Sequence, residues 1–155
     1  MSSAMGRYVQ SIVERAGQEA REDGSSATEA HHLLLAIAGE PETVTHQVLS
    51  SVGLDRRAIR DALDREFERS LGSVGVATFE LPRASAEPGR PRLGSSAKLA
   101  IARGFGSVAR KGDLRPAHLL VGILQAPVGT VPRALDLAGI DREDLRVRVL
   151  QTLAG

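Results

Sequence analysis

The sequence predicts an all-α fold, an eight-helix bundle made of two tandem four-helix repeats related by a pseudo-twofold axis. Three observations support this prediction. The chain of 155 residues aligns with itself without gaps after a shift of about 86 residues. Apolar residues recur at helical spacing in both halves. Aromatic residues are few, with three Phe, one Tyr and no Trp, so the core must be aliphatic, which suits closely packed helices.

The repeat is clearest in two pairs of segments. Residues 32–37 (HLLLAI) align with residues 118–123 (HLLVGI), and residues 53–56 (GLDR) align with residues 139–142 (GIDR). Matches in one register over several separate segments rarely arise by chance, and they indicate an internal duplication.

The first two helices of the first repeat are separated by residues 24–26 (GSS), a run that breaks helices. Thr28 then offers a side-chain oxygen as the N-cap of the second helix, which we expect to run through Ala38. The first helix itself is predicted from apolar residues at helical spacing, which are Tyr8, Val9, Ile12, Val13, Ala16 and Ala20.

A glycine and an aspartate join the third and fourth helices of this repeat. We expect the third helix from about Thr43 to Val52, with Gly53 at its C′ position, where a left-handed conformation costs glycine little. Asp55 then caps the fourth helix. Gly139 and Asp141 repeat this arrangement in the second half.

The second repeat follows the same order of elements. Ser95 or Ser96 opens its first helix, and residues 111–113 (KGD) break the chain. Pro116 stands in the first turn of the next helix, where proline is tolerated. The last helix is expected to end at about Leu153.

Composition identifies a linker between the repeats. Residues 72–81 have an extended pattern, and residues 82–92 combine prolines with arginines, as exposed irregular segments do. A plain tether explains this composition, and a mobile flap or a site for an acidic partner is the alternative. We expect one domain, residues 1–155, divided into repeat one at about 5–70, the linker at about 71–93 and repeat two at about 94–153.

Charge and composition restrict the classes of partner. Lys and Arg number 20 and Asp and Glu number 19, so no excess positive charge favours nucleic acid or an anionic membrane. Cysteine is absent, the first residues lack the apolar core of a signal peptide, and no apolar run approaches the ~18 residues that span a bilayer. We expect a cytoplasmic protein without a membrane or nucleic-acid partner, and we expect a monomer.

The four histidines, at positions 31, 32, 46 and 118, do not point to catalysis or to a metal. His32 and His118 occupy equivalent repeat positions just inside a helix, which favours a shared capping or packing role. His31 and His32 are adjacent, unlike the i, i+4 pair of a helical zinc site. Residues 104–106 (GFG) do not follow a strand, so they indicate tight helix packing or local helix weakness rather than a nucleotide site. We predict no catalytic residue, no metal site and no cofactor.

The doubled pattern resembles a known family. Each half has a helix, then His-Leu-Leu-Leu/Val-Ala/Gly-Ile, then Leu-x-x-x-Gly-Leu/Ile-Asp, and this order looks like the Clp N-terminal repeat, most of all that of bacterial ClpC-class chaperones. The resemblance covers about Met5 to Leu153. It implies an eight-helix bundle that precedes two ATPase modules and recruits substrates, adaptors or cyclic-peptide antibiotics. The chain itself has no Gly-x-x-x-x-Gly-Lys-Ser/Thr loop to hold ATP phosphates.

The resemblance also implies two candidate sites. In some ClpC proteins a Thr-Glu pair before the repeat histidine binds phosphoarginine. Here residues 30–31 (AH) and 116–117 (PA) occupy those positions. No carboxylate is therefore available there to accept hydrogen bonds from the guanidinium. The other site is a groove between the first helices of the two repeats, whose aromatic anchors are replaced here by Met5 and Leu93. These two side chains bind an apolar ligand or merely cap the core. The remaining groove residues are Gln10, Val13, Glu14, Gly17, Lys98 and Ala102.

From this resemblance we predict a non-catalytic protein- or peptide-binding module of the Clp protease system. It would dock an apolar segment of a substrate, an adaptor or a cyclic peptide in the groove, and would act as a decoy or adaptor if it stands alone. The alternative is the substrate-recruiting N-terminal part of a longer ATP-dependent ClpC-type unfoldase. A hydrolase that uses Ser and His has no supporting motif, since Gly-x-Ser-x-Gly is absent.

Overall fold

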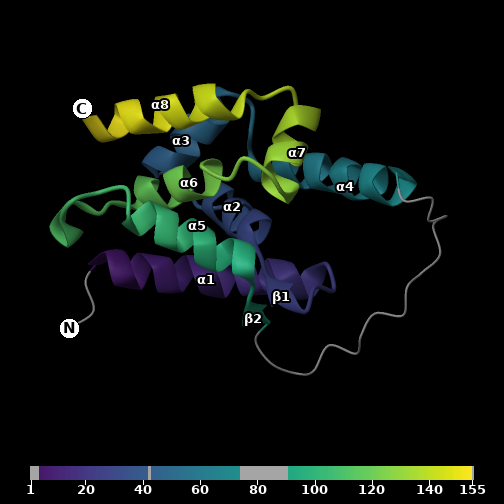
Figure 1. Ribbon diagram of the computed structural model, residues 1–155, viewed down its shortest axis with the longest axis horizontal. Coiled ribbons are helices and arrows are strands. Elements are labelled where there is room, and N and C mark those ends of the chain that lie inside the picture. Colours follow the sequence, from purple (N-terminus) through teal and green to yellow (C-terminus); the bar gives the residue numbers. More distant parts are fainter. Residues whose placement is uncertain (1–3, 42, 74–90, 155) are drawn as a thin grey trace.

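The computed structural model describes residues 4–41, 43–73 and 91–154, and this part of the chain is almost entirely helical, as predicted (Figure 1). The first repeat contributes α1 (Ala4–Glu22), α2 (Ala30–Ala38), α3 (Val44–Ser51) and α4 (Arg56–Ser73). The second repeat contributes α5 (Ser95–Phe105), α6 (Pro116–Leu124), α7 (Thr130–Leu137) and α8 (Arg142–Ala154). The remaining elements are a 3-10 turn, η1 (Lys111–Asp113), and two short parallel strands, β1 (Ala27–Thr28) and β2 (Arg92–Leu93).

The duplication is visible in the helix boundaries. The shift of about 86 residues found in the sequence carries α2 onto α6 and α3 onto α7, with both ends of each helix in register. The same shift carries the first residue of α4 onto the first residue of α8. The predicted pair of four-helix repeats is therefore confirmed.

Helices α2 and α6 form the centre of the bundle. Figure 1 shows them between α1 and α5 on one side and α3 and α8 on the other. Nearly every residue of both helices is buried, including Leu33, Ile37, Leu119 and Ile123, none of which is exposed to solvent. Both helices are apolar on all sides, as a helix surrounded by other helices must be.

The predicted left-handed glycine and the predicted aspartate N-cap are present in both repeats. Gly53 and Gly139 follow α3 and α7 with φ of 79° and 74°, the left-handed conformation that glycine adopts cheaply. The Oδ1 atom of Asp55 accepts a hydrogen bond from the backbone N–H of Ala58 at 2.8 Å. Asp141 caps α8 in the same way, at 3.1 Å. These local signals placed the starts of α4 and α8 correctly.

The prediction that Thr28 caps α2 is wrong. Thr28 lies in β1, where it pairs with Leu93 of β2, and its carbonyl accepts a hydrogen bond from the Gly94 N–H at 2.8 Å. The N-cap of α2 is Glu29 instead. A strand pair between residues far apart in the sequence holds Thr28 in an extended conformation, one residue too early to cap the helix.

The second repeat begins close to its predicted position. Helix α5 starts at Ser95, with Gly94 as its N-cap. Ser96 does not cap this helix, because its hydroxyl accepts a hydrogen bond from the Ala30 N–H at 2.9 Å and donates one to Glu29 at 3.0 Å. The hydroxyl therefore joins the start of α5 to the start of α2.

The expected linker, about 71–93, differs at both ends from what the described residues show. Helix α4 continues through Ser73, so residues 72 and 73 are helical rather than extended, and residues 92 and 93 form β2. The rest of the predicted extended and proline-rich segment, residues 74–90, lies outside the described residues. The division of the chain into one domain with this linker stays a prediction.

Helices α5 and α6 cross at two glycines. A Cβ atom at Gly122 would lie 2.1 Å from the carbonyl oxygen of Ala100, and one at Gly104 would lie 2.6 Å from the carbonyl oxygen of His118. Both positions therefore exclude a side chain while the backbones stay this close. Tight helix packing, one of the two explanations offered for residues 104–106, is confirmed.

Buried carboxylates tie other helices together. Glu19 of α1 accepts hydrogen bonds from Arg56 Nη2 at 2.6 Å and from Arg60 Nη2 at 3.1 Å, both on α4. Glu66 of α4 accepts one from Arg133 Nε at 2.8 Å, on α7. The second pair joins the two repeats. None of the described helices is long and apolar enough to cross a membrane.

Candidate binding site

Four of the eight predicted groove residues line one surface cavity. Val13, Glu14 and Gly17 of α1 meet Leu93 of β2 around a volume of about 190 Å³. The strand pair positions this meeting, because it holds the chain before α5 against the end of β1. Pro91 approaches the backbone of Gly17, where an added Cβ would lie 3.8 Å from the proline Cδ atom. We call this the α1–β2 cavity, and the first repeat and the segment that leads into α5 both contribute to it.

The other four predicted groove residues lie outside this cavity. Gln10, Lys98 and Ala102 are exposed on α1 and α5. Met5 is buried, with 8% of its surface exposed, and belongs to the hydrophobic core. Its position agrees with the alternative that this side chain caps the core. An apolar ligand would reach Met5 only after the surrounding side chains move.

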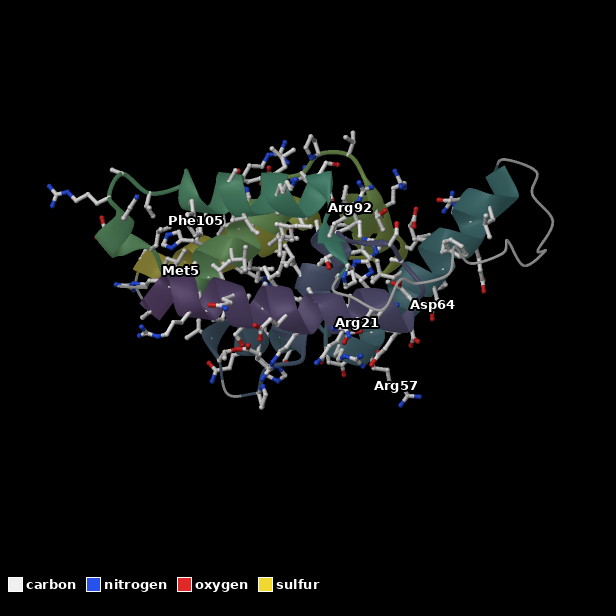
Figure 2. The ribbon with its side chains drawn as sticks, turned by 90° about the horizontal axis from the view of Figure 1, so that it is seen from below. Met5, Arg21, Arg57, Asp64, Arg92 and Phe105 are labelled. Atoms are coloured by element: carbon white, nitrogen blue, oxygen red, sulfur yellow. The ribbon has the colours of Figure 1, made fainter. Side chains whose placement is uncertain are left out.

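Phe105 was not among the predicted groove residues, although it is an exposed aromatic on the same side of the molecule. Helices α1 and α5 run in opposite directions, so the start of α1 and the end of α5 lie together (Figures 1 and 2). Figure 2 shows Met5 and Phe105 at that end. Phe105 has 39% of its surface exposed. The sequence showed an apolar position on a helix and contained no signal that it would face solvent.

Two further cavities are related by the repeat. The His31 cavity, of about 420 Å³, lies between the start of α2 and the turn before α7. The Tyr8 cavity, of about 290 Å³, lies between the start of α6 and the turn before α3. The shift of about 86 residues carries residues 29–31, at the start of α2, onto residues 115–117, and residues 43–45 onto residues 129–131. Each cavity therefore combines one helix start with the loop of the other repeat.

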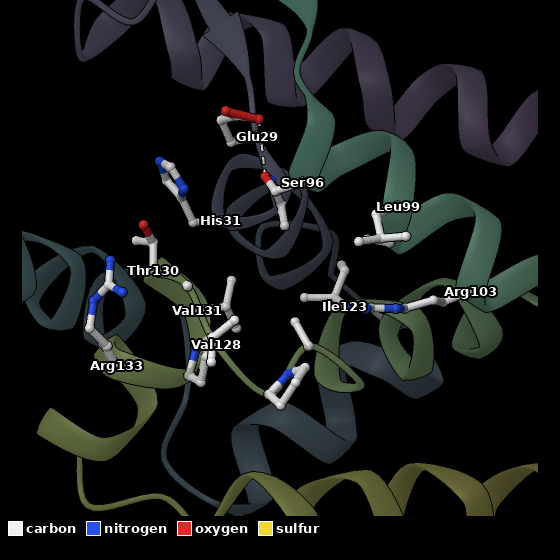
Figure 3. Close-up of a pocket in the computed structure, with 16 residues that line it drawn as sticks. Glu29, His31, Ser96, Leu99, Arg103, Ile123, Val128, Thr130, Val131 and Arg133 are labelled. Atoms are coloured by element: carbon white, nitrogen blue, oxygen red, sulfur yellow. Dashed lines mark hydrogen bonds between the residues drawn. The ribbon is translucent and has the colours of Figure 1, made fainter.

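The His31 cavity has apolar walls and cationic groups at its edge (Figure 3). Leu99, Val128 and Val131 supply apolar surface, and Val128 is 81% exposed. Arg103 lies beside Ile123 in Figure 3, and the remaining cation is Arg133, which is paired with Glu66. The cavity also contains the Glu29 carboxylate, which accepts the Ser96 hydroxyl.

His31 is a neutral member of this cavity. The pKa of His31 is lowered from 6.5 to about 4: burial is the largest cause, His32 and Arg60 act in the same direction, and Asp23 and Glu66 oppose them. The imidazole is therefore uncharged near pH 7. His31 and Ala117 stand where the resemblance places the two phosphoarginine carboxylates, and they line one cavity each. Neither cavity has a carboxylate at that position.

The histidines at the helix starts have a capping role, as predicted. His32 Nδ1 accepts a hydrogen bond from the Glu29 N–H, and His118 Nδ1 accepts one from the Arg115 N–H, both at 2.9 Å. On its other side, His32 Nε2 lies 2.7 Å from Asp23 Oδ2. Burial raises the pKa of Asp23, but hydrogen bonds from His32 and Ser25 outweigh it and leave this pKa below its usual value.

These hydrogen bonds argue against a metal at the one histidine–carboxylate group that the described ranges bring together. Ligand atoms of Asp23, His31 and His32 lie within 4.8 Å of one another. Because His32 Nδ1 accepts a backbone N–H, its proton must be on Nε2, where it is donated to Asp23. A metal ligand nitrogen must be unprotonated, so coordination through Nε2 would cost the cap of α2.

The fold and the cavities define an all-α domain of two tandem helical repeats with open surface cavities. The chain belongs to the Clp repeat (R) N-terminal domain family, whose model matches residues 5–101. Over 140 residues it is 26% identical to the chloroplastic chaperone protein ClpC1 of Oryza sativa subsp. japonica. Over 142 residues it is 26% identical to the ATP-binding subunit ClpA homolog of the ATP-dependent Clp protease of Porphyra purpurea.

These relatives are much longer proteins. The matches cover 90% and 92% of this chain but only 14% of the Oryza protein and 16% of the Porphyra protein. The predicted bacterial source is not supported by them and stays a prediction. The fold is similar to that of the N-terminal domain of the caseinolytic protease associated chaperone ClpD from Arabidopsis thaliana, with a TM-score of 0.66 and 19% identity. That similarity covers 94% of this chain and 91% of the other.

Proposed function

We propose that the chain is a non-catalytic module that binds exposed apolar segments of other proteins for a Clp-type, ATP-dependent unfoldase. The observation that carries this proposal is the α1–β2 cavity, which unites Val13, Glu14 and Gly17 of the first repeat with Leu93 of β2. Concave, partly apolar sites built where two structural units meet are typical of ligand binding. Family membership agrees with this use.

The chemistry of the cavity suits a peptide. Val13 and Leu93 supply apolar contact area for an aliphatic or aromatic anchor, while Glu14 and Arg21 place one charge of each sign at the edge. Such an edge favours neither acidic nor basic segments, so apolar contact would dominate affinity. Gly17 is buried beside Pro91 and Thr28, and its lack of a side chain lets the segment around β2 lie close to α1.

Binding is tested by titrating a fluorescently labelled, uncharged apolar peptide into the protein and measuring anisotropy. We expect saturable binding that Leu93→Asp or Val13→Asp weakens about tenfold or more, because a charge in the contact must be desolvated. Val147→Asp is the matched control, since Val147 is also an exposed apolar residue, 45% exposed, but lies on α8. Met5→Asp is unsuitable because Met5 is buried.

Two outcomes would count against the proposal. One is the absence of saturable binding by the folded protein. The other is binding that Leu93→Asp and Val13→Asp leave unchanged, since the peptide would then bind elsewhere. Circular dichroism of each variant establishes that the helices are intact.

The module could serve the unfoldase in two ways. As the N-terminal part of a longer ClpC-type chain, it would deliver substrates to the ATPase modules, and as a separate protein it would act as a decoy or an adaptor. A degradation assay distinguishes the decoy from the adaptor. The chain is added in excess to a ClpC-type chaperone, its protease and an unfolded substrate. A decoy slows degradation and an adaptor accelerates it. An unchanged rate argues against both and leaves the role within a longer chain.

A further inference from the structure

The hydroxyl of Tyr8 is buried, yet it has no hydrogen-bond partner in the described part of the chain. The nearby Thr45 hydroxyl is engaged with Thr43 Oγ1, at 3.1 Å. Burial, followed by the negative charge of Glu40, raises the pKa of Tyr8, against smaller opposing effects of the Thr45 hydroxyl as a hydrogen-bonding group and of the positive charge of Arg15. The phenol keeps its proton, and no described atom accepts a hydrogen bond from it. Buried polar groups of this kind are few in native proteins and call for an explanation.

Tyr8 lines the cavity named after it, and the walls of this cavity are largely apolar. The apolar residues that line it include Val44, Pro116, Ala117 and Leu153. Val44 is 53% exposed, so it stands at the mouth. The volume of about 290 Å³ lies at the low end of the roughly 300–1,000 Å³ of small-molecule pockets, which fits one or two side chains better than a large ligand.

The charges around the cavity disfavour a charged ligand. Glu40 lines one side, with Arg15 Nη1 3.7 Å from its carboxylate, and Arg115 lines the other side. An anionic ligand would meet Glu40 next to Tyr8, and a cationic ligand would meet Arg115. An uncharged group avoids both penalties and still gains the apolar contacts.

The two repeat-related cavities have diverged in chemistry. The repeat counterpart of Tyr8 is Gly94, which has no side chain, and the counterpart of Ala117 is His31. The His31 cavity therefore carries an imidazole and two arginines, Arg103 and Arg133, whereas the Tyr8 cavity carries a phenol and apolar groups beside Glu40 and Arg115. The divergence implies different ligands for the two cavities.

We propose that the Tyr8 cavity is a second subsite, which binds an uncharged aliphatic side chain of a polypeptide and donates the Tyr8 hydroxyl to a carbonyl oxygen of the same segment. This proposal rests on the proposed function, because it supposes that the module binds peptides. It is a separate site, since Tyr8 and the α1–β2 residues Val13 and Gly17 line different cavities on α1. A peptide carbonyl satisfies the buried donor, and the side chain fills the apolar volume.

Intrinsic fluorescence provides a specific readout, since Tyr8 is the only tyrosine and there is no tryptophan. The probe is acetyl-Leu-Leu-amide, which is uncharged and carries carbonyl acceptors. We expect a saturable change in tyrosine emission on titration. Acetyl-Asp-Asp-amide and acetyl-Lys-Lys-amide are expected to bind at least about tenfold more weakly, because each brings charge to the cavity. Equal binding of the charged probes would overturn the proposal.

Two variants test the geometry. Val44→Asp at the mouth is expected to abolish the fluorescence change, whereas Val128→Asp, at an even more exposed position in the His31 cavity (81% against 53% for Val44), leaves it intact. We expect Tyr8→Phe to keep the fold. Its affinity for the probe, measured from amide chemical shifts in NMR, should be roughly 2- to 10-fold lower than that of the wild type, because one hydrogen bond is lost. Unchanged affinity in Tyr8→Phe refutes the hydrogen bond, and a signal insensitive to Val44→Asp refutes the site.

The two proposals fail separately. If the long apolar peptide binds and depends on Leu93, but acetyl-Leu-Leu-amide leaves tyrosine emission unchanged, the module binds peptides and the second subsite does not exist. If the dipeptide changes the emission and depends on Val44, while Leu93→Asp has no effect on the long peptide, the Tyr8 cavity binds and the α1–β2 cavity does not.

Discussion

His32 and His118 hold equivalent positions in the two repeats and make the same hydrogen bond, in which Nδ1 accepts the backbone N–H three residues earlier at 2.9 Å. In each case the histidine is the third residue of its helix, where a capping box usually has Glu or Gln. Both rings are almost fully buried. Imidazole suits this position because it satisfies a helix-end donor without placing a negative charge in the core.

Replacing His118 with alanine should destabilise the domain by about 1–2 kcal/mol, the usual cost of losing a cap. His32→Ala should cost at least about 1 kcal/mol more, because the bond from Nε2 to Asp23 is lost as well. Urea unfolding followed by circular dichroism measures both. His118→Glu restores the acceptor and should recover part of the loss. If His118→Ala and His118→Glu unfold alike and both match the wild type, the hydrogen bond does not stabilise the fold.

The features that the sequence predicts correctly are those determined by local residues. The capping histidines, the left-handed Gly53 and Gly139, and the cap at Asp55 each depend on residues within one turn, so a short pattern identifies them. The prediction failed at Thr28, where pairing with a strand more than sixty residues away in the chain overrides the local preference for a cap.

The candidate site was only partly predictable for the same reason. Val13 and Leu93, which the family resemblance assigned to one groove, line the same cavity. Met5 was expected either at the groove or as a cap of the core, and it is buried, as the second alternative predicts. A helical pattern shows which residues share a face but not which face the rest of the chain covers. The Tyr8 and His31 cavities each combine a helix start with a loop of the other repeat, and only the packed structure shows that combination.

Stability should fall as the pH is lowered from about 6.5 to about 4 because of His31. The unfolded chain binds a proton at this residue near pH 6.5, whereas the folded chain does so only near pH 4, since burial disfavours the charged form. Full stability is therefore present above pH 6.5 and is lost progressively down to pH 4, by up to about 3 kcal/mol. The pKa of Asp23 is lowered in the folded chain, so stability falls further once the pH drops below the usual pKa of an aspartate.

Urea unfolding at several pH values, in the wild type and in His31→Gln, tests this. The variant should show a flatter dependence between pH 6.5 and pH 4. His46→Gln, which retains His31, should keep the wild-type slope. An unchanged slope in His31→Gln would show that another group controls acid sensitivity.

Gly122→Ala should destabilise the domain by about 3 kcal/mol or more. The added methyl group would lie 2.1 Å from the Ala100 carbonyl and 2.6 Å from the Gly104 nitrogen, so α5 and α6 must move apart. Gly112→Ala is the control, because a Cβ at that position meets nothing within 4 Å, and its effect should stay within about 0.5 kcal/mol. Thermal unfolding measures both. A mild effect at Gly122 would mean that the helices adjust more easily than their packing indicates.

The Glu66–Arg133 pair should hold the two repeats together by a measurable coupling energy. Glu66 is 6% exposed and accepts hydrogen bonds at Oε1 from Arg133 Nε at 2.8 Å and from the Ser70 hydroxyl at 2.7 Å. Arg133→Ala leaves this carboxylate without its cation, and Glu66→Ala leaves an arginine that is largely solvated, so the first change should be the more costly.

A double-mutant cycle in urea isolates the pair. Since the Arg133 side chain is 57% exposed, solvent screening limits the coupling to about 1 kcal/mol. The coupling should shrink in high salt, because exposed charges are screened. Additive effects of the two changes would show that the bond contributes nothing beyond packing, and α4 and α7 would then be held by their apolar contacts alone.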